Sequence, residues 1–173
     1  MATPQRILLA PGASGNPKQL APHAAGLQAR RYEVEIVALP KGTVERAMPV
    51  YREAIGKDPS RVVTGGQSFG GRVASLLAAE DPPKALVLFA YPLHAPGRHE
   101  AWRDRTAHWQ RITCPVLFLS GESDPFARID LLREAVTQLS AATLVTYPGV
   151  GHGVGPVLDD ALDEVAAFLR ANS

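Results

Sequence analysis

The sequence contains one cysteine, Cys114, which excludes an internal disulfide framework and any metal site built on paired cysteines. Lys and Arg (18) nearly balance Asp and Glu (17), so the formal net charge is only +1. No bulk electrostatic bias therefore directs the chain toward nucleic acid or an anionic membrane. No apolar run reaches the roughly 18 residues that a membrane helix needs, and residues 1–6 contain no apolar signal core. These absences favour a cytoplasmic protein that binds neither nucleic acid nor membrane.

The sequence also lacks the common motifs for cofactor and metal binding. The sequence has no P-loop, no dinucleotide-binding fingerprint and no cluster of metal-ligating residues, so we expect neither a cofactor nor a metal. Cys114 directly precedes Pro115 at the start of an apolar run, where a small buried hydrophobic side chain is the simplest interpretation. The 173 residues can bury a sizeable core and contain no interdomain linker. We therefore expect a single domain over residues 1–173, and the sequence leaves its oligomeric state open.

Short aliphatic runs alternate along the chain with longer segments of helical periodicity. Such alternation predicts βαβ units, and therefore an α/β fold with a mostly parallel sheet of about six strands and helices on both faces. Two of the runs are continuously apolar, as expected of strands buried on both faces. The expected strands are Arg6–Ala10, Glu33–Ala38, Arg61–Thr64, Ala85–Phe89, Val116–Ser120 and Thr143–Tyr147, and the expected helices are Pro17–Arg30, Thr43–Gly56, Phe69–Ala79, Arg128–Leu139 and Pro156–Ala171.

The most informative motif is Gly66–Gly70, which reads Gly-Gln-Ser-Phe-Gly between a strand-like and a helix-like segment. In that context G-x-S-x-G is typical of a nucleophile elbow, a tight turn that exposes the hydroxyl of its serine, here Ser68. The turn strains the serine backbone, and the flanking glycines allow neighbouring backbone to approach. The motif alone would arise by chance in roughly one such chain in twenty. An ordinary Gly-rich turn is therefore the alternative that further residues must exclude.

Two more polar residues with possible catalytic roles lie just after strands of the predicted sheet. In an open parallel sheet, chemistry gathers at the carboxyl ends of the strands. Asp124 follows the strand Val116–Ser120, and His152 follows Thr143–Tyr147 in a Gly-rich loop. We expect Ser68, Asp124 and His152 to form a catalytic triad, in which the histidine takes the serine proton and the carboxylate orients the imidazole.

Each member of this triad has an alternative. Glu122 is the nearest rival for the acid, and His94, in the loop after the fourth strand, is the best rival for the base. Asp124 itself could be a turn former or a helix cap, and His152 a flexible loop residue. The order of the three residues along the chain favours the triad over these alternatives.

The developing oxyanion needs donors that are already aimed at it. We expect one to be the backbone N–H of Phe69 and the other to come from the loop Pro11–Gly15, with Ala13 as its best candidate. The alternative is that this loop only starts a helix. Tyr91 and His94 follow a central strand and are candidates to line the substrate pocket.

The segment Tyr91–Thr113 is the longest stretch without a central strand. Arginines alternate there with tryptophans and histidines, which indicates either an amphipathic helix resting on the core or a patch that favours acidic groups. The residues concerned are Arg98, Arg103, Arg105, Arg111, Trp102, Trp109, His99 and His108.

Together these features resemble the α/β-hydrolase superfamily over nearly the whole chain. Within it the chain is similar to small proteins described as predicted α/β-hydrolases, which are related to dienelactone-hydrolase-like enzymes and to a hydrolase-like domain of some chromatin-complex subunits. The resemblance rests on Gly65–Ser75, Tyr91–Gly97 and Gly121–Phe126, and it implies Ser68, Asp124 and His152 as the catalytic residues.

The chain departs from the family pattern in two places. Many members carry His-Gly in the oxyanion loop, where Pro11 and Gly12 stand in this chain, and the first strand corresponds to the third strand of the full fold. The second departure predicts a reduced sheet with the site intact.

We therefore expect a serine hydrolase that cleaves a small-molecule ester, thioester or related acyl compound through an acyl-enzyme on Ser68. Two alternatives remain: a catalytically silent hydrolase-fold module used for protein interaction, and an enzyme that transfers the acyl group to an acceptor other than water. A complete triad favours an enzyme, because an interaction module has no need of all three groups.

Overall fold

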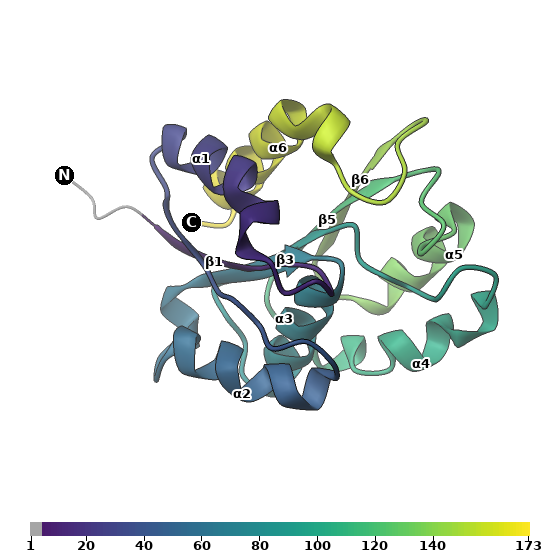
Figure 1. The fold of residues 1–173 in the computed structure, drawn as a ribbon, viewed down its shortest axis with the longest axis horizontal. Coiled ribbons are helices and arrows are strands. Elements are labelled where there is room, and N and C mark those ends of the chain that lie inside the picture. The colour runs from purple at the N-terminus through teal and green to yellow at the C-terminus, as the bar shows by residue number, and fades with distance from the viewer. Residues whose placement is uncertain (1–4) are drawn as a thin grey trace.

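The computed structural model describes residues 5–173 and contains one six-stranded sheet, in which every neighbouring pair of strands is parallel (Figure 1). The strand order is β2-β1-β3-β4-β5-β6. The first strand, β1, has β2 on one side and β3 to β6 in succession on the other. Because all the strands are parallel, the carboxyl ends of β3, β5 and β6 lie along one edge of the sheet. The strands are β1 (Arg6–Ala10), β2 (Glu33–Ile36), β3 (Val63–Gln67), β4 (Ala85–Phe89), β5 (Val116–Gly121) and β6 (Ala142–Tyr147).

Helices cover both faces of the sheet, so the molecule has three layers (Figure 1). Helices α1 and α6 pack together on one face, while α2, α3 and α4 lie on the other. This architecture confirms the expected minimal α/β-hydrolase fold. The helices are α1 (Ala21–Ala29), α2 (Val44–Ile55), α3 (Phe69–Glu80), α4 (Trp102–Thr106), α5 (Ile129–Ala135) and α6 (Leu158–Ala171).

The apolar core forms two layers, because alternate residues of each strand point to opposite faces of the sheet. In β4, Leu86 and Leu88 pack with the side of α2 and α3, whereas Val87 and Phe89 pack with the side of α1 and α6. All five residues of β4 are buried, which explains why this segment shows no polar alternation in the sequence.

Two predicted strands have the wrong bounds: β2 ends at Ile36 rather than at Ala38, and β3 is shifted at both ends. The sequence suggested Arg61–Thr64, but Arg61 belongs to a 3₁₀ turn and β3 continues through Gly65 and Gly66 to Gln67. Glycines have low strand propensity, and here neighbouring groups hold them in place. The hydroxyl of the buried Tyr51 lies 2.9 Å from the carbonyl oxygen of Leu8 and 2.8 Å from that of Gly65, and it accepts the N–H of Gly65 at 3.0 Å.

The segment between β4 and β5 contains the short helix α4, and it packs on the core through its tryptophans. Trp109 is fully buried and Trp102 nearly so, whereas Arg103 is exposed and lies over the Trp102 ring, 4.6 Å from its centroid. The amphipathic interpretation is therefore confirmed for Trp102, Trp109 and Arg103.

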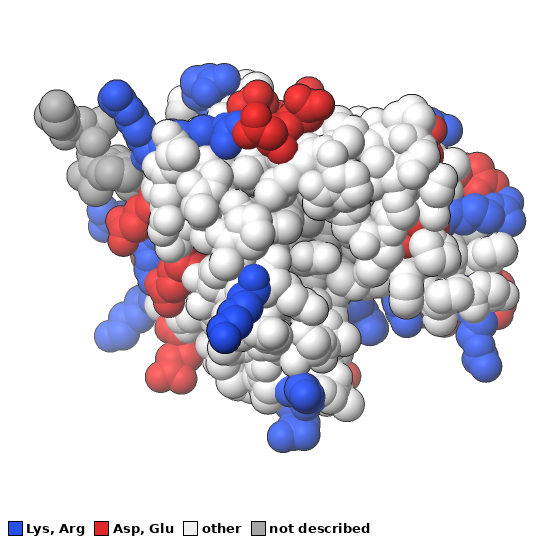
Figure 2. Space-filling model, turned by 45° about the horizontal axis from the view of Figure 1, so that its top comes forward, with Lys and Arg blue, Asp and Glu red and all other residues white. Residues whose placement is uncertain are grey.

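Charges of both signs are distributed over the surface. Figure 2 shows Lys and Arg interspersed with Asp and Glu, with no large area of a single sign on that face. This distribution agrees with the net charge of +1. Of the helices in the described part of the chain, none combines the length and apolar character needed to cross a bilayer.

Candidate active site

Ser68 occupies a strained turn between β3 and α3. Its φ is 50° and its ψ is −119°, a conformation that non-glycine residues rarely adopt. The turn is possible because its flanking residues are small. A Cβ atom at Gly66 would meet the carbonyl oxygen of Ala10, and one at Gly70 would meet those of Ala10 and Pro11. The predicted elbow geometry is thus present, and the serine hydroxyl stands at the carboxyl end of the sheet.

The three residues proposed for the triad come together in one hydrogen-bonded relay. The Oγ of Ser68 lies 2.9 Å from Nε2 of His152, and Nδ1 of His152 lies 2.8 Å from Oδ2 of Asp124. The Asp124 side chain is completely buried, whereas the His152 side chain is 24% exposed. The serine and histidine can therefore be reached by a ligand while the carboxylate is shielded from water, as a base and its orienting acid require.

Each carboxylate oxygen of Asp124 has its own hydrogen-bond partner. Its Oδ1 accepts the backbone N–H of Phe126 at 2.8 Å, which leaves Oδ2 directed at the imidazole. The Phe126 ring in turn packs against the His152 ring, with 4.4 Å between centroids and an interplanar angle of 35°. The acid loop therefore determines the position of both the carboxylate and the imidazole plane.

The loop that carries His152 is attached to the end of β5. The N–H of Ser123 donates to the carbonyl of Val150 at 2.9 Å, and a Cβ atom at Gly121 would meet the same carbonyl. A glycine at the end of β5 thus allows the histidine loop to lie close to the acid loop.

Neither rival residue takes part in the relay. Glu122 accepts the hydroxyl of Thr146 at 2.8 Å and one N–H of Arg133 at 3.3 Å, so it is directed away from the imidazole. His94 is fully buried, and its Nε2 accepts the backbone N–H of Arg128 at 3.0 Å.

Ala13 and Phe69 lie beside Ser68, where the expected oxyanion donors belong. Both residues line a small cavity of about 180 Å³ that also includes Ser68. Phe69 is the first residue of α3, and the first N–H groups of a helix have no partner within it. Its N–H is thus available at the nucleophile. Ala13 lies in the loop after β1, which carries Pro11 and Gly12 in place of His-Gly, and its role as the second donor stays a prediction.

The expectation that Tyr91 and His94 line the pocket is wrong. Tyr91 is fully buried, packs edge-on against Trp109, and donates its hydroxyl to the carbonyl of Arg105 at 2.8 Å. Burial raises the pKa of Tyr91, which keeps it a neutral phenol. His94 is also fully buried, so neither side chain reaches a ligand at Ser68. The chain leaves β4 through Ala90, whose φ of 50° is a backbone conformation that the hydrophobic pattern does not predict.

Two hollows flank the serine–histidine pair. The first is the 180 Å³ cavity next to Ser68, which we call the serine-side pocket; it is lined by Ala13, Ser68, Phe69, Arg72, Pro92, Arg105 and Phe126. The second, of about 480 Å³, is called the histidine-side pocket; it is lined by Gln19, Pro22, His23, Gln67, His152, Gly153, Val154, Gly155, Pro156 and Leu158. Arg72 was not among the residues predicted for the pocket, although its place one helical turn after Ser68 was a signal for it.

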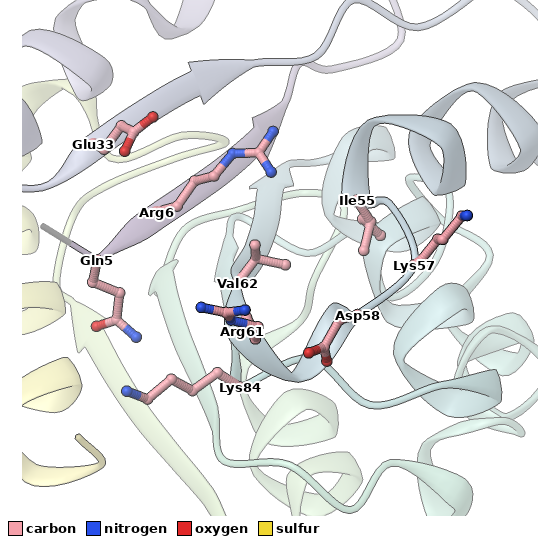
Figure 3. Close-up of a pocket in the computed structure, with 9 residues that line it drawn as sticks. All are labelled: Gln5, Arg6, Glu33, Ile55, Lys57, Asp58, Arg61, Val62 and Lys84. Carbon is pink, nitrogen blue, oxygen red and sulfur yellow. The ribbon is translucent and has the colours of Figure 1, made fainter. Parts of the chain in front are cut away.

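A third hollow, of about 630 Å³, lies far from this site, at the amino-terminal ends of β1 and β2 (Figure 3). It contains no serine, cysteine or histidine, so it offers no nucleophile with a base. Its lining residues are Gln5, Arg6, Glu33, Ile55, Lys57, Asp58, Arg61, Val62 and Lys84.

Cys114 is buried, as expected, and burial raises its thiol pKa to about 11, so it is an unreactive thiol. Within residues 5–173, no group of three or more His, Cys, Asp or Glu side chains is arranged to hold a metal ion.

The fold and the serine elbow together define an α/β hydrolase by architecture. The sequence matches the family described as alpha/beta hydrolase domain over residues 40–166, and the chain belongs to that family. The narrower likeness to dienelactone-hydrolase-like proteins stays a prediction.

The chain is also similar to individual proteins. An uncharacterized protein of Mycobacterium tuberculosis is 33% identical over 128 residues, which are 65% of this chain and 46% of that protein. The chain thus spans about half the length of the curated relatives it matches. Among solved structures, the monoacylglycerol lipase of Paleococcus ferrophilus superimposes with a TM-score of 0.83 at 15% identity, covering 100% of this chain and 97% of that one. Esterase 2 of Thermogutta terrifontis, phosphonylated by sarin, gives 0.75 at 18% identity, with coverages of 97% and 84%. At these identities the structures establish a common fold.

Proposed function

We propose that this chain is a serine hydrolase that cleaves an ester or thioester of a small molecule through an acyl-enzyme on Ser68. The observation that carries the proposal is the continuous relay from Ser68 through His152 to the buried Asp124. The names of structural neighbours, a lipase and an esterase that sarin phosphonylates, support the same reaction class.

In this mechanism Ser68 Oγ attacks the substrate carbonyl carbon as His152 Nε2 takes its proton. The negative charge that forms on the carbonyl oxygen is bound by the N–H groups of Phe69 and Ala13. His152 then gives the proton to the leaving oxygen or sulfur, and the bond from that atom to the acyl carbon breaks. A water molecule, deprotonated by His152, attacks the acyl-enzyme, and release of the acid regenerates Ser68.

The two alternatives use these features differently. A silent interaction module would not need a strained serine, an oriented imidazole and a buried carboxylate in contact. An acyltransferase would use the same first step and would differ in the acceptor that attacks the acyl-enzyme.

The proposal is tested by treating the protein with a fluorophosphonate probe and measuring its intact mass. We expect one adduct per chain, located by peptide mapping in the tryptic peptide Val62–Arg72, in which Ser68 is the single serine. Labelling of another peptide, or no labelling of a folded protein that hydrolyses no activated ester, would refute the proposal.

The small serine-side pocket sets an upper limit on acyl length. Its volume of about 180 Å³ is below the roughly 300–1,000 Å³ that is typical of ligand pockets, so it can enclose only a short acyl chain. Each further methylene group stays in water and gains little of the about 0.8 kcal/mol that full burial would contribute. In a p-nitrophenyl ester series we therefore expect kcat/KM to level off or fall beyond short acyl chains. A steady rise into long-chain esters would contradict this prediction.

A further inference from the structure

Two arginines line the same pocket as the candidate nucleophile. Arg72 lies on α3, and its backbone N–H donates to the carbonyl of Ser68 at 3.0 Å, one helical turn away. Side chains on a helix lean toward its N-terminus, so the Arg72 guanidinium lies over the turn that begins at Ser68. Arg105 reaches the pocket from α4, and both residues line it beside Ala13 and Phe69.

Neither guanidinium is neutralised by the protein. Among residues 5–173, no carboxylate forms an ion pair with Arg72 or Arg105. The Nε of Arg72 is buried and has no hydrogen-bond partner in the same part of the chain. A buried donor without an acceptor costs free energy, and an anionic ligand would satisfy it.

Arg105 is held in position by the core. Its backbone carbonyl accepts the hydroxyl of the buried Tyr91 at 2.8 Å, and one of its guanidinium nitrogens donates to the carbonyl of Pro92 at 3.1 Å. Burial lowers the pKa of the Arg105 guanidinium, and repulsion by the positive charge of Arg72 lowers it further. Tyr91 thus positions a pocket residue although it does not line the pocket.

The two pockets differ in charge: the serine-side pocket contains Arg72 and Arg105, whereas the histidine-side pocket has no such charged side chain. Apart from His152, the residues that line the histidine-side pocket carry no Lys, Arg, Asp or Glu side chain, and burial lowers the pKa of its other histidine, His23, to about 4. During acyl transfer the leaving group must lie near His152, which gives it a proton, and the acyl group must stay on Ser68. The positive charge therefore lies on the acyl side.

We propose that the acyl group of the substrate carries a negative charge, and that Arg72 and Arg105 bind it. This inference rests on the proposed function. The volume of the serine-side pocket suits a short acyl group, such as the half-ester of a four-carbon dicarboxylic acid. Arginine is suited to this role because its planar guanidinium can donate two hydrogen bonds to one carboxylate.

The test compares two esters of the same shape. Monoethyl succinate carries a carboxylate, and ethyl 4-methylpentanoate carries two methyl groups in place of the carboxylate oxygens. We expect the wild-type protein to cleave the succinate ester at least about 10-fold more efficiently, measured as kcat/KM from ethanol release. Arg72→Gln and Arg105→Gln should each reduce that preference about 10-fold, the loss expected for one hydrogen-bonded charge.

The matched control is Arg98→Gln, since Arg98 is an exposed arginine of the same segment as Arg105 and lines no part of the pocket. It should keep both the activity and the preference. Arg72→Lys, which retains the charge, should keep part of the preference, and thermal unfolding verifies that each variant is folded. A third ester, the acetyl ester of 3-hydroxypropanoate, carries its charge on the leaving group and should gain no advantage.

The outcomes separate this inference from the proposed function. Ser68-dependent cleavage of both ethyl esters at equal efficiency would overturn the anionic acyl group and leave the serine hydrolase intact. A preference that survives in both arginine variants, or one for charge on the leaving group, would overturn it as well. If no ester is cleaved and the fluorophosphonate does not label Ser68, the proposed function fails, and the inference fails with it.

Discussion

Replacing Ser68 with alanine is expected to lower kcat for an activated ester by about five to six orders of magnitude, the loss seen when a triad serine is removed elsewhere. Without Oγ no acyl-enzyme can form, and the imidazole of His152 has no proton to accept. Fluorophosphonate labelling of the peptide Val62–Arg72 should disappear as well. Turnover is measured as p-nitrophenol release from p-nitrophenyl acetate.

The fold should survive this substitution. Alanine keeps the Cβ atom of serine, so the strain at φ 50° is the same in both proteins, and the thermal unfolding temperature should change little. Ser123→Ala is the matched control, because Ser123 is exposed on the acid loop and its contact with Val150 is made by its backbone. Equal turnover in the Ser68 variant and the wild-type protein would show that the nucleophile lies elsewhere.

The hydrogen-bonded contact of Ser68 and Asp124 with His152 was predictable because it follows from topology. In a parallel sheet every strand ends at the same edge, so residues placed just after β3, β5 and β6 must lie near one another. The chain order of Ser68, Asp124 and His152 was therefore sufficient to bring them together, even though the predicted start and end of β3 were both too early. Local errors of a few residues do not change which strand ends meet.

The substrate contacts were not predictable in the same way. They depend on how a chain leaves a strand, and that is decided by backbone torsions rather than by hydrophobic pattern. The chain leaves β4 through Ala90 at a positive φ, and Tyr91 lies in the core, where an aromatic residue packs equally well. Of the four arginines in the following segment, Arg105 alone lines the serine-side pocket, and nothing in their spacing distinguishes it from Arg103.

Replacing Asp124 with asparagine is expected to lower kcat by about three to four orders of magnitude while leaving the protein folded. The size of the effect follows from the hydrogen bonds around this carboxylate. The backbone N–H of Phe126 donates to Oδ1 and must keep an acceptor, so the asparagine carbonyl will face Phe126. Its NH₂ group will then face Nδ1 of His152, where Oδ2 stands in the wild-type protein.

That arrangement changes the tautomer of the His152 imidazole. An NH₂ group donates, so Nδ1 must accept, and the proton of the neutral ring moves to Nε2, which faces Ser68 at 2.9 Å. A protonated Nε2 cannot take the serine proton, and the fluorophosphonate reaction should slow in parallel with ester turnover. Asp130→Asn is the matched control: Asp130 is exposed and pairs with Arg128 on the surface, where an ion pair contributes little. It should retain full turnover of p-nitrophenyl acetate. If the Asp124 and Asp130 variants behaved alike, Asp124 would be a turn former rather than the residue that orients the base.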